Sequence, residues 1–151
     1  MFDALNLPPF DIPLRRLADG TVQVHDPLRG KWLVLTPEEW VRQHFVHFLT
    51  SERQYPQALL ANEVSLRLNG TARRCDTVAF TRDLHPLMIV EYKRTSVAIT
   101  RAVFDQIARY NSVLGARYLV VSNGLHHYCC RFDATGYTFL HEIPTYPEII
   151  G

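Results

Sequence analysis

A short apolar run that ends in charged residues is the feature that most constrains the fold of this chain. Residues 87–90 read Leu-Met-Ile-Val, and Glu91-Tyr92-Lys93 follows directly. A run of this length without alternating polar residues is typical of a strand that is covered on both faces of its sheet. Side chains two apart on a strand share a face, so Glu91 and Lys93 project together from the strand end. The run therefore predicts a sheet with helices on both sides.

Two helices are predicted around this strand. Thr36-Pro37-Glu38-Glu39 is a helix start, with Thr36 as N-cap and Glu39 as its capping-box partner, and the helix is predicted to end near Thr50. A second helix is predicted over 100–114, because Gly115 is a typical C-terminal signal. Apolar residues at helical spacing predict its buried stripe. That stripe consists of Val103, Ile107, Tyr110 and Leu114.

Strands are predicted on both sides of the second helix, and Asn69-Gly70 predicts a hairpin turn between two of them. The order of helices and strands predicts an α/β fold, a three-layer α/β/α sandwich with a mixed central sheet. The strands are expected over 31–35, 62–68, 73–80, 87–92, 118–122, 128–132 and 137–141.

The length of 151 residues suits one domain. We expect an N-terminal arm and hairpin over 1–30, a core over 31–132, and a C-terminal strand and tail over 133–151. The chain has no apolar run of about 18 residues and no signal pattern, so we expect a cytoplasmic protein without a membrane partner. The three cysteines, at 75, 129 and 130, form neither a disulfide framework nor a zinc pattern.

Asp76 is the acid that could complete a site with Glu91 and Lys93. If strands 73–80 and 87–92 pair antiparallel, Asp76 lies beside Glu91, whereas a slip of one residue would turn it away. Two carboxylates, helped by the main-chain carbonyl of Tyr92, would suit Mg²⁺ or Mn²⁺. Such a metal activates water, and Lys93 would orient that water or stabilise negative charge on phosphorus. The set predicts metal-dependent hydrolysis of phosphodiester bonds.

The spacing of Asp76, Glu91 and Lys93 resembles the D-x(n)-E-x-K signature of the PD-(D/E)XK nucleases. The surrounding sequence resembles the N-terminal nuclease domain of type I restriction enzyme R subunits in its standalone form. Cys75 stands where the literal signature has proline, and no helicase motor follows, so we do not expect a complete R subunit. The matching segments are 36–43, 74–78, 90–93, 104–111 and 118–127.

The resemblance implies a restriction-endonuclease-like core and a magnesium-dependent nuclease acting on DNA, with RNA as an open alternative. A homodimer or larger nuclease assembly would suit cleavage of both DNA strands. The resemblance also implies that Glu39 completes the metal site and that Gln106 lies beside it. Each has an alternative: Glu39 as a capping residue only, and Gln106 as an exposed helix residue. Glu63 is expected to be an exposed strand residue.

A basic face for phosphates is a further prediction, carried by Arg74, Arg94 and Arg109, with scattered solvated arginines as the alternative. The net charge of +1 gives nucleic-acid binding no support, so such a face would have to be local. The rival functions are a catalytically silent nucleic-acid-binding or assembly module with the same fold, and an interaction protein whose E-x-K is accidental.

Overall fold

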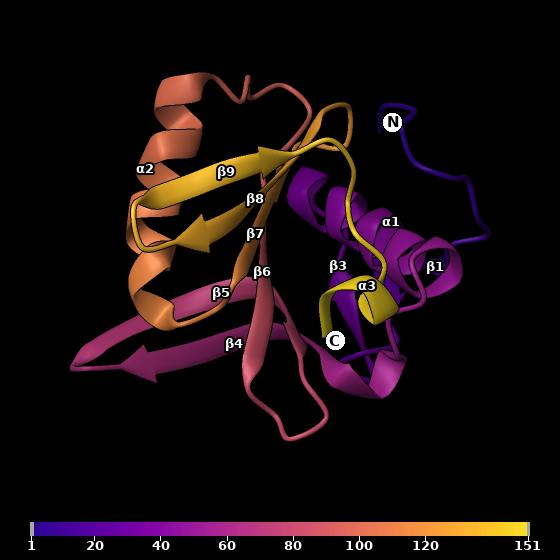
Figure 1. Ribbon diagram of the computed structural model, residues 1–151. Helices are drawn as coiled ribbons and strands as arrows, with labels where there is room; N and C mark the ends of the chain where they lie inside the picture. Colours follow the sequence, from indigo (N-terminus) through magenta and orange to yellow (C-terminus); the bar gives the residue numbers. More distant parts are fainter. Residues whose placement is uncertain (1, 151) are drawn as a thin grey trace.

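A six-stranded mixed sheet forms the centre of the computed structural model, which describes residues 2–150 (Figure 1). β6 and β7 are parallel and the other neighbours are antiparallel, because α2 (Arg101–Asn111) provides the crossover between β6 and β7. The strands, in spatial order, are β4 (Leu60–Leu68), β5 (Thr71–Phe80), β6 (Pro86–Tyr92), β7 (Tyr118–Ser122), β8 (His127–Asp133) and β9 (Gly136–Leu140).

Helices cover both faces of this sheet, as the apolar run of β6 predicted. α1 (Pro37–Glu52) and the short α3 (Tyr146–Ile150) pack on one face, and α2 packs on the other. Successive β6 residues enter opposite cores: Val90 packs with Phe45 of α1, and Ile89 packs with Ile107 of α2. The predicted three-layer α/β sandwich is confirmed, and it is compatible with a restriction-endonuclease-like core.

A second, three-stranded antiparallel sheet precedes α1. It consists of β1 (Leu14–Arg16), β2 (Val22–Asp26) and β3 (Lys31–Val34). Its last β2 residue, Asp26, is fully buried and accepts hydrogen bonds from Arg29 and from Asn62 of β4, the latter at 3.0 Å. A buried polar link therefore attaches this sheet to the central one.

Local signals place the predicted element ends correctly. The Thr36 hydroxyl accepts a hydrogen bond from the N–H of Glu39 at 3.1 Å, as an N-cap does. Asn69 and Gly70 both have positive φ, at 52° and 81°, which a two-residue hairpin turn of this kind requires. The helix predicted over 100–114 ends as α-helix at Asn111 and continues as a 3₁₀ turn over Ser112–Leu114. A further 3₁₀ turn, Gln57–Leu59, lies outside the predicted elements.

The predicted buried stripe of the second helix is correct only in part. Ile107 and Leu114 are buried, but Tyr110 is 46% exposed, because α2 turns Phe104, Ala108 and Asn111 towards the sheet. The C-terminal tail contains α3, whose Tyr146 and Ile149 are buried in the core beside α1.

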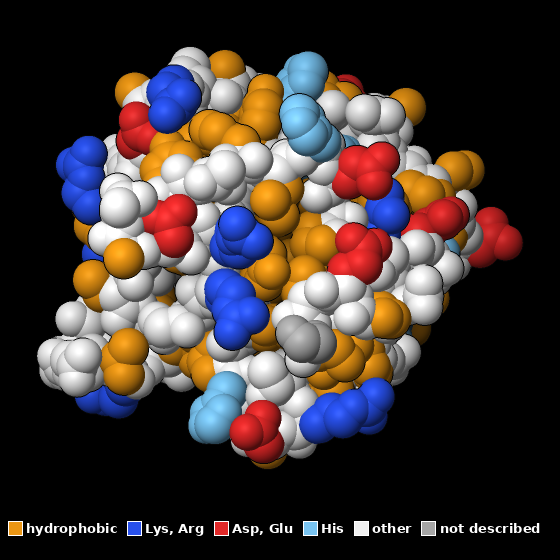
Figure 2. Space-filling view, viewed as in Figure 1, with side chains coloured by type: hydrophobic (Ala, Val, Ile, Leu, Met, Phe, Trp, Pro, Cys, Tyr) orange, Lys and Arg blue, Asp and Glu red, His pale blue; other side chains and the backbone are white. Residues whose placement is uncertain are grey.

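Within residues 2–150, no helix is long and apolar enough to cross a membrane. The three cysteines are buried and free. The face formed by β8, β9 and α3 carries basic, acidic and apolar side chains interspersed, with no single sign of charge in excess (Figure 2). Any basic surface for nucleic acid must therefore lie elsewhere.

Candidate active site

Asp76 and Glu91 occupy neighbouring positions on two antiparallel strands. The β5–β6 ladder pairs Thr77 with Val90, and Asp76 and Glu91 are the next residues beyond that pair. The predicted antiparallel pairing is therefore present, in the register that sets the two acids side by side. The main-chain N–H of Tyr92 donates a hydrogen bond to Oδ2 of Asp76 at 2.8 Å, which holds that carboxylate at the end of β6.

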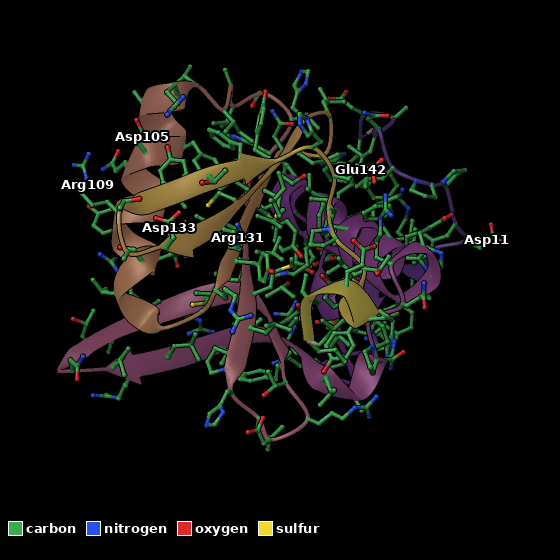
Figure 3. All side chains as sticks on the ribbon, in the orientation of Figure 1. Asp11, Asp105, Arg109, Arg131, Asp133 and Glu142 are labelled. Atoms are coloured by element: carbon green, nitrogen blue, oxygen red, sulfur yellow. The ribbon has the colours of Figure 1, made fainter. Side chains whose placement is uncertain are left out.

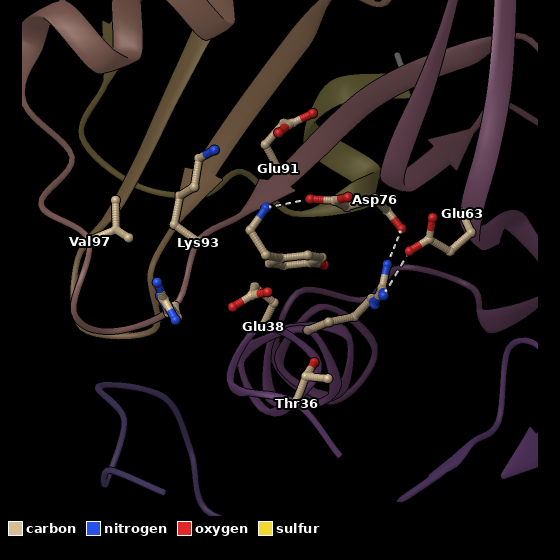
Figure 4. A pocket seen from close by; sticks show the side chains of 10 residues that line it. Thr36, Glu38, Glu63, Asp76, Glu91, Lys93 and Val97 are labelled. Atoms are coloured by element: carbon tan, nitrogen blue, oxygen red, sulfur yellow. Dashed lines mark hydrogen bonds and ion pairs between the residues drawn. The ribbon is translucent and has the colours of Figure 1, made fainter. Parts of the chain in front are cut away.

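The two acids open into a cavity of about 660 Å³ at the carboxyl end of β6. Lys93 borders the same cavity, and its side chain lies on the same side as that of Glu91 (Figure 4). The main-chain N–H of Lys93 donates to the Ser122 carbonyl of β7 at 2.8 Å, which fixes the chain as it leaves the strand. The other residues around the cavity are Thr36, Glu38, Arg42, Glu63, Tyr92, Arg94 and Val97.

Electrostatics in this cavity favour a bound cation. Burial raises the pKa of Glu91 to about 7, and the nearby charge of Asp76 adds to that effect. Burial also raises the pKa of Asp76, although the Tyr92 hydrogen bond opposes the shift. Two partly buried carboxylates that repel each other are stabilised when a positive ion lies between them.

The donor set fits an ion that keeps much of its water. Within the described residues, no group of three or more histidine, cysteine, aspartate or glutamate side chains could hold a metal alone. Asp76 and Glu91 supply two carboxylates, which is the number that Mg²⁺ sites commonly use beside waters and substrate phosphates. A closed structural zinc site, with four protein ligands, does not fit this set.

Arg42 of α1 forms the wall of the cavity beside Asp76. Its Nη1 donates to the Asp76 carbonyl oxygen at 2.9 Å, and its Nη2 pairs with Oε1 of Glu63 at 2.9 Å. The β4–β5 ladder pairs residues on either side of Glu63 and Asp76 but not these two, and Glu63 has a φ of 57°. The left-handed turn at Glu63 thus interrupts the ladder, and Arg42 binds both residues at the interruption.

Glu63 is half-buried in the cavity wall and not simply exposed, as the sequence had led us to expect. Arg74 also pairs with it, at 2.7 Å. Burial alone would raise the pKa of Glu63, but hydrogen bonds from Arg74 and Arg42 hold it below the usual range. No local pattern identifies this residue, because its position depends on a left-handed backbone turn and on a pairing with Arg42 of another element.

Glu39 lies behind the cavity and does not border it. Its carboxylate accepts hydrogen bonds from Arg29, Arg42 and Gln43, each with one contact at 2.9 Å. Burial alone would raise the pKa of Glu39, but the Arg42 guanidinium outweighs it and the pKa is lowered. Its neighbour Glu38 borders the cavity instead. The structure therefore does not bring Glu39 to the other predicted metal ligands.

Gln106 borders a second cavity, of about 420 Å³, between α2 and β5. This cavity shares Glu91, Lys93 and Val97 with the first, so the two adjoin, and together they are called the groove. Of the three arginines predicted to bind phosphate, Arg94 borders the first cavity and Arg74 the second. Arg109 extends from the outer side of α2 and borders neither (Figure 3).

A protein-family model covers most of the chain. The family described as type I restriction enzyme R protein N terminus matches residues 37–144, which include α1, the whole central sheet and α2. The match includes Asp76, Glu91, Lys93 and Gln106, and it excludes the N-terminal sheet. None of the curated proteins compared with the chain matches it.

Proposed function

Because the chain belongs to the family of type I restriction enzyme R protein N-terminal domains, we propose that it is a Mg²⁺-dependent nuclease that hydrolyses phosphodiester bonds in DNA. One observation carries the proposal: two partly buried carboxylates with raised pKa values meet a lysine in one open cavity. Function is argued from this site, since a fold alone hosts many activities.

Asp76 and Glu91 would hold Mg²⁺ or Mn²⁺, together with the main-chain carbonyl of Tyr92. A bound metal would polarise a phosphoryl oxygen and lower the pKa of water. The raised pKa values support this role, because both carboxyl groups bind protons more tightly than usual when no cation balances them. The hydrogen bond from the Tyr92 N–H to Oδ2 fixes the orientation of the Asp76 carboxylate at the end of β6.

Lys93 would act on the scissile phosphate and on the attacking water. Lys93 borders both cavities of the groove. A phosphate that lies between the two cavities would therefore be close to the Lys93 ammonium group. A cation at this position stabilises the negative charge that develops on phosphorus. Lys93 would also orient the water, and Gln106 would contact the substrate on the α2 side.

Arg42 and Glu63 would act as positioning residues. Arg42 holds the Asp76 carbonyl and the Glu63 carboxylate at 2.9 Å each, so it fixes the strand from which Asp76 projects. Glu39 neutralises Arg42 but does not border the cavity, so we assign it a role in stability and not in catalysis. A homodimer would supply one site for each strand of a DNA duplex. We place the protein in the cytoplasm, where it would meet a DNA substrate.

The second candidate is a catalytically silent nucleic-acid-binding module. The position of Glu39 favours it, because this predicted metal ligand is bound by Arg29 and Arg42 and does not border the cavity. Such a module would bind DNA by its basic residues and would have no need of a divalent ion.

A cleavage assay on plasmid and single-stranded DNA, with Mg²⁺ or Mn²⁺, separates these candidates. We expect cleavage by the unaltered protein and a loss of at least about a hundredfold in Lys93→Met, which removes the charge and keeps the length. Asp76→Asn should be inactive, whereas Asp133→Asn, an exposed acid of β8, should match the unaltered protein. Metal-independent DNA binding without cleavage would favour the silent module.

A further inference from the structure

We propose that Arg73 and Tyr110 form a stacking subsite for one base of a single-stranded polynucleotide, beside the phosphate held at Asp76 and Glu91. The inference rests on the proposed nuclease function and names the form of its substrate. Arg73 lies on β5 and Tyr110 on α2, and both border the second cavity of the groove.

The geometry of the pair suits a planar ring. The Arg73 guanidinium lies 3.9 Å from the centre of the Tyr110 ring, and Tyr110 is still 46% exposed. Arg73 therefore covers part of the tyrosine and leaves the rest open to the cavity. Aromatic rings and guanidinium planes are the surfaces on which unpaired bases stack in proteins that bind single strands.

The position of the pair matches the path of a polynucleotide. The second cavity shares Glu91 and Lys93 with the first, so a chain whose phosphate reaches these residues continues into the space beside Tyr110. Arg73 adds positive charge on that side, where Glu91 is the one acid among the described residues that borders the cavity, whereas Glu38 and Glu63 border the first cavity among its arginines. Gln106 is exposed in the same cavity, and its carboxamide can both donate to and accept from a base edge.

The size of the cavity favours an unpaired nucleotide. Its volume of about 420 Å³ lies near the lower end of the range for small-molecule pockets, about 300–1,000 Å³. A base within a duplex is already stacked and paired, so it cannot reach a ring at the side of such a pocket without leaving the helix. Tyr110 would thus favour single-stranded DNA or an unpaired end over an intact duplex.

Binding is measured separately from cleavage, by fluorescence anisotropy with Ca²⁺ in place of Mg²⁺. The probes are a labelled single-stranded oligothymidylate and a labelled duplex of mixed sequence. We expect Tyr110→Ala to weaken single-strand binding about tenfold, within the range that one stacked base supplies, and duplex binding far less. Tyr110→Phe, which keeps the ring, should bind as the unaltered protein does.

Tyr128→Ala is the matched control, since Tyr128 is a 39% exposed tyrosine of β8 that does not border this cavity. Unchanged single-strand binding in Tyr110→Ala would overturn the subsite, and so would an equal loss in Tyr128→Ala or on the duplex. Melting curves check that each variant is folded. Mg²⁺-dependent cleavage with no effect of Tyr110→Ala would overturn the subsite alone, whereas Tyr110-dependent binding without cleavage would overturn the nuclease proposal alone.

Discussion

The main-chain N–H of Tyr92 donates a hydrogen bond to the carboxylate of Asp76 at 2.8 Å, across the end of the β5–β6 ladder. This bond joins the two strands at the point where their side chains change from apolar to charged. It also leaves the carboxylates of Asp76 and Glu91 side by side, and within residues 2–150 neither carboxylate is paired with a basic side chain. The backbone therefore holds the two carboxylates close together. Their burial and mutual repulsion lower the stability of the metal-free protein.

That effect predicts how stability depends on pH. Burial and the charge of Asp76 raise the pKa of Glu91 to about 7, above its value of 4.5 in an unfolded chain. The folded protein therefore binds this proton more tightly, so metal-free protein should lose stability as the pH rises from about 4.5 through 7. We predict that Glu91→Gln at pH 8 is more stable than the unaltered protein by roughly 1–3 kcal/mol.

Urea unfolding between pH 5 and pH 8, without divalent metal, measures this difference. Glu38→Gln is the matched control, since Glu38 borders the same cavity but is exposed. Its stability should follow that of the unaltered protein at every pH. A Glu91→Gln variant that is less stable at pH 8 would show that Glu91 carries no such electrostatic cost.

Arg42 is predicted to be the arginine on which the folded site depends most. Burial alone would lower the pKa of its guanidinium, but Glu39 and Glu63 raise it above the usual range. Arg42→Met would leave both carboxylates without their buried partner, so we expect a loss of about 3–5 kcal/mol in the free energy of unfolding. Arg74→Met removes the exposed partner of Glu63 and should cost less than about 1 kcal/mol. Similar losses in the two variants, by urea denaturation, would contradict the assignment.

Replacing Glu39 should lower the stability of the fold without lowering the rate of DNA cleavage. Because its carboxylate binds Arg29 and Arg42 and does not border the cavity, Glu39→Gln should destabilise the fold by about 3 kcal/mol. Below its lowered melting temperature the variant should still cleave DNA at close to the normal rate. Asp76→Asn should do the reverse, with stability kept and cleavage lost. A fully folded Glu39→Gln protein without activity would place Glu39 among the metal ligands after all.

The N-terminal sheet should stabilise the core although it lies outside the family match. Burial alone would raise the pKa of Asp26, but hydrogen bonds from Asn62 and Arg29 lower it below the usual range. Its contribution is therefore present at neutral pH and lost as the pH falls through that lowered pKa. We predict that Asp26→Asn costs about 3 kcal/mol at pH 7, that the difference from the unaltered protein begins to shrink below about pH 4, and that it is lost only below the lowered pKa of Asp26. Urea unfolding at pH 7 and at a series of pH values below about 4 measures the difference, and a difference independent of pH would contradict the ion pair.

The elements could be predicted because their signals are local. The Thr36 cap, the Asn69-Gly70 turn and the apolar β6 run each depend on a few adjacent residues. The buried face of α2 could not be predicted in the same way. Ile107 and Leu114 are buried as predicted, but only packing against the sheet decides that Phe104 is buried and Tyr110 exposed.

The candidate site was predictable only in part, for a related reason. The register that puts Asp76 beside Glu91 is a tertiary property, although the D-x(n)-E-x-K spacing pointed to it. Glu38 and Glu39 are adjacent on α1, and the sequence does not say which faces the cavity, because Arg29 of a different sheet binds Glu39. Glu63 depends on a left-handed backbone turn that Arg42 stabilises from another element.

The central claim is that Asp76 and Glu91 together hold one divalent cation. Isothermal titration of the metal-free protein with Mn²⁺ tests it most directly, with Asp76→Asn and Glu91→Gln beside the unaltered chain and Glu38→Gln as the control. The account predicts one ion per chain in the unaltered and Glu38→Gln proteins and no measurable binding in the other two. Binding that survives in both Asp76→Asn and Glu91→Gln, or that is absent from the unaltered protein, would contradict it.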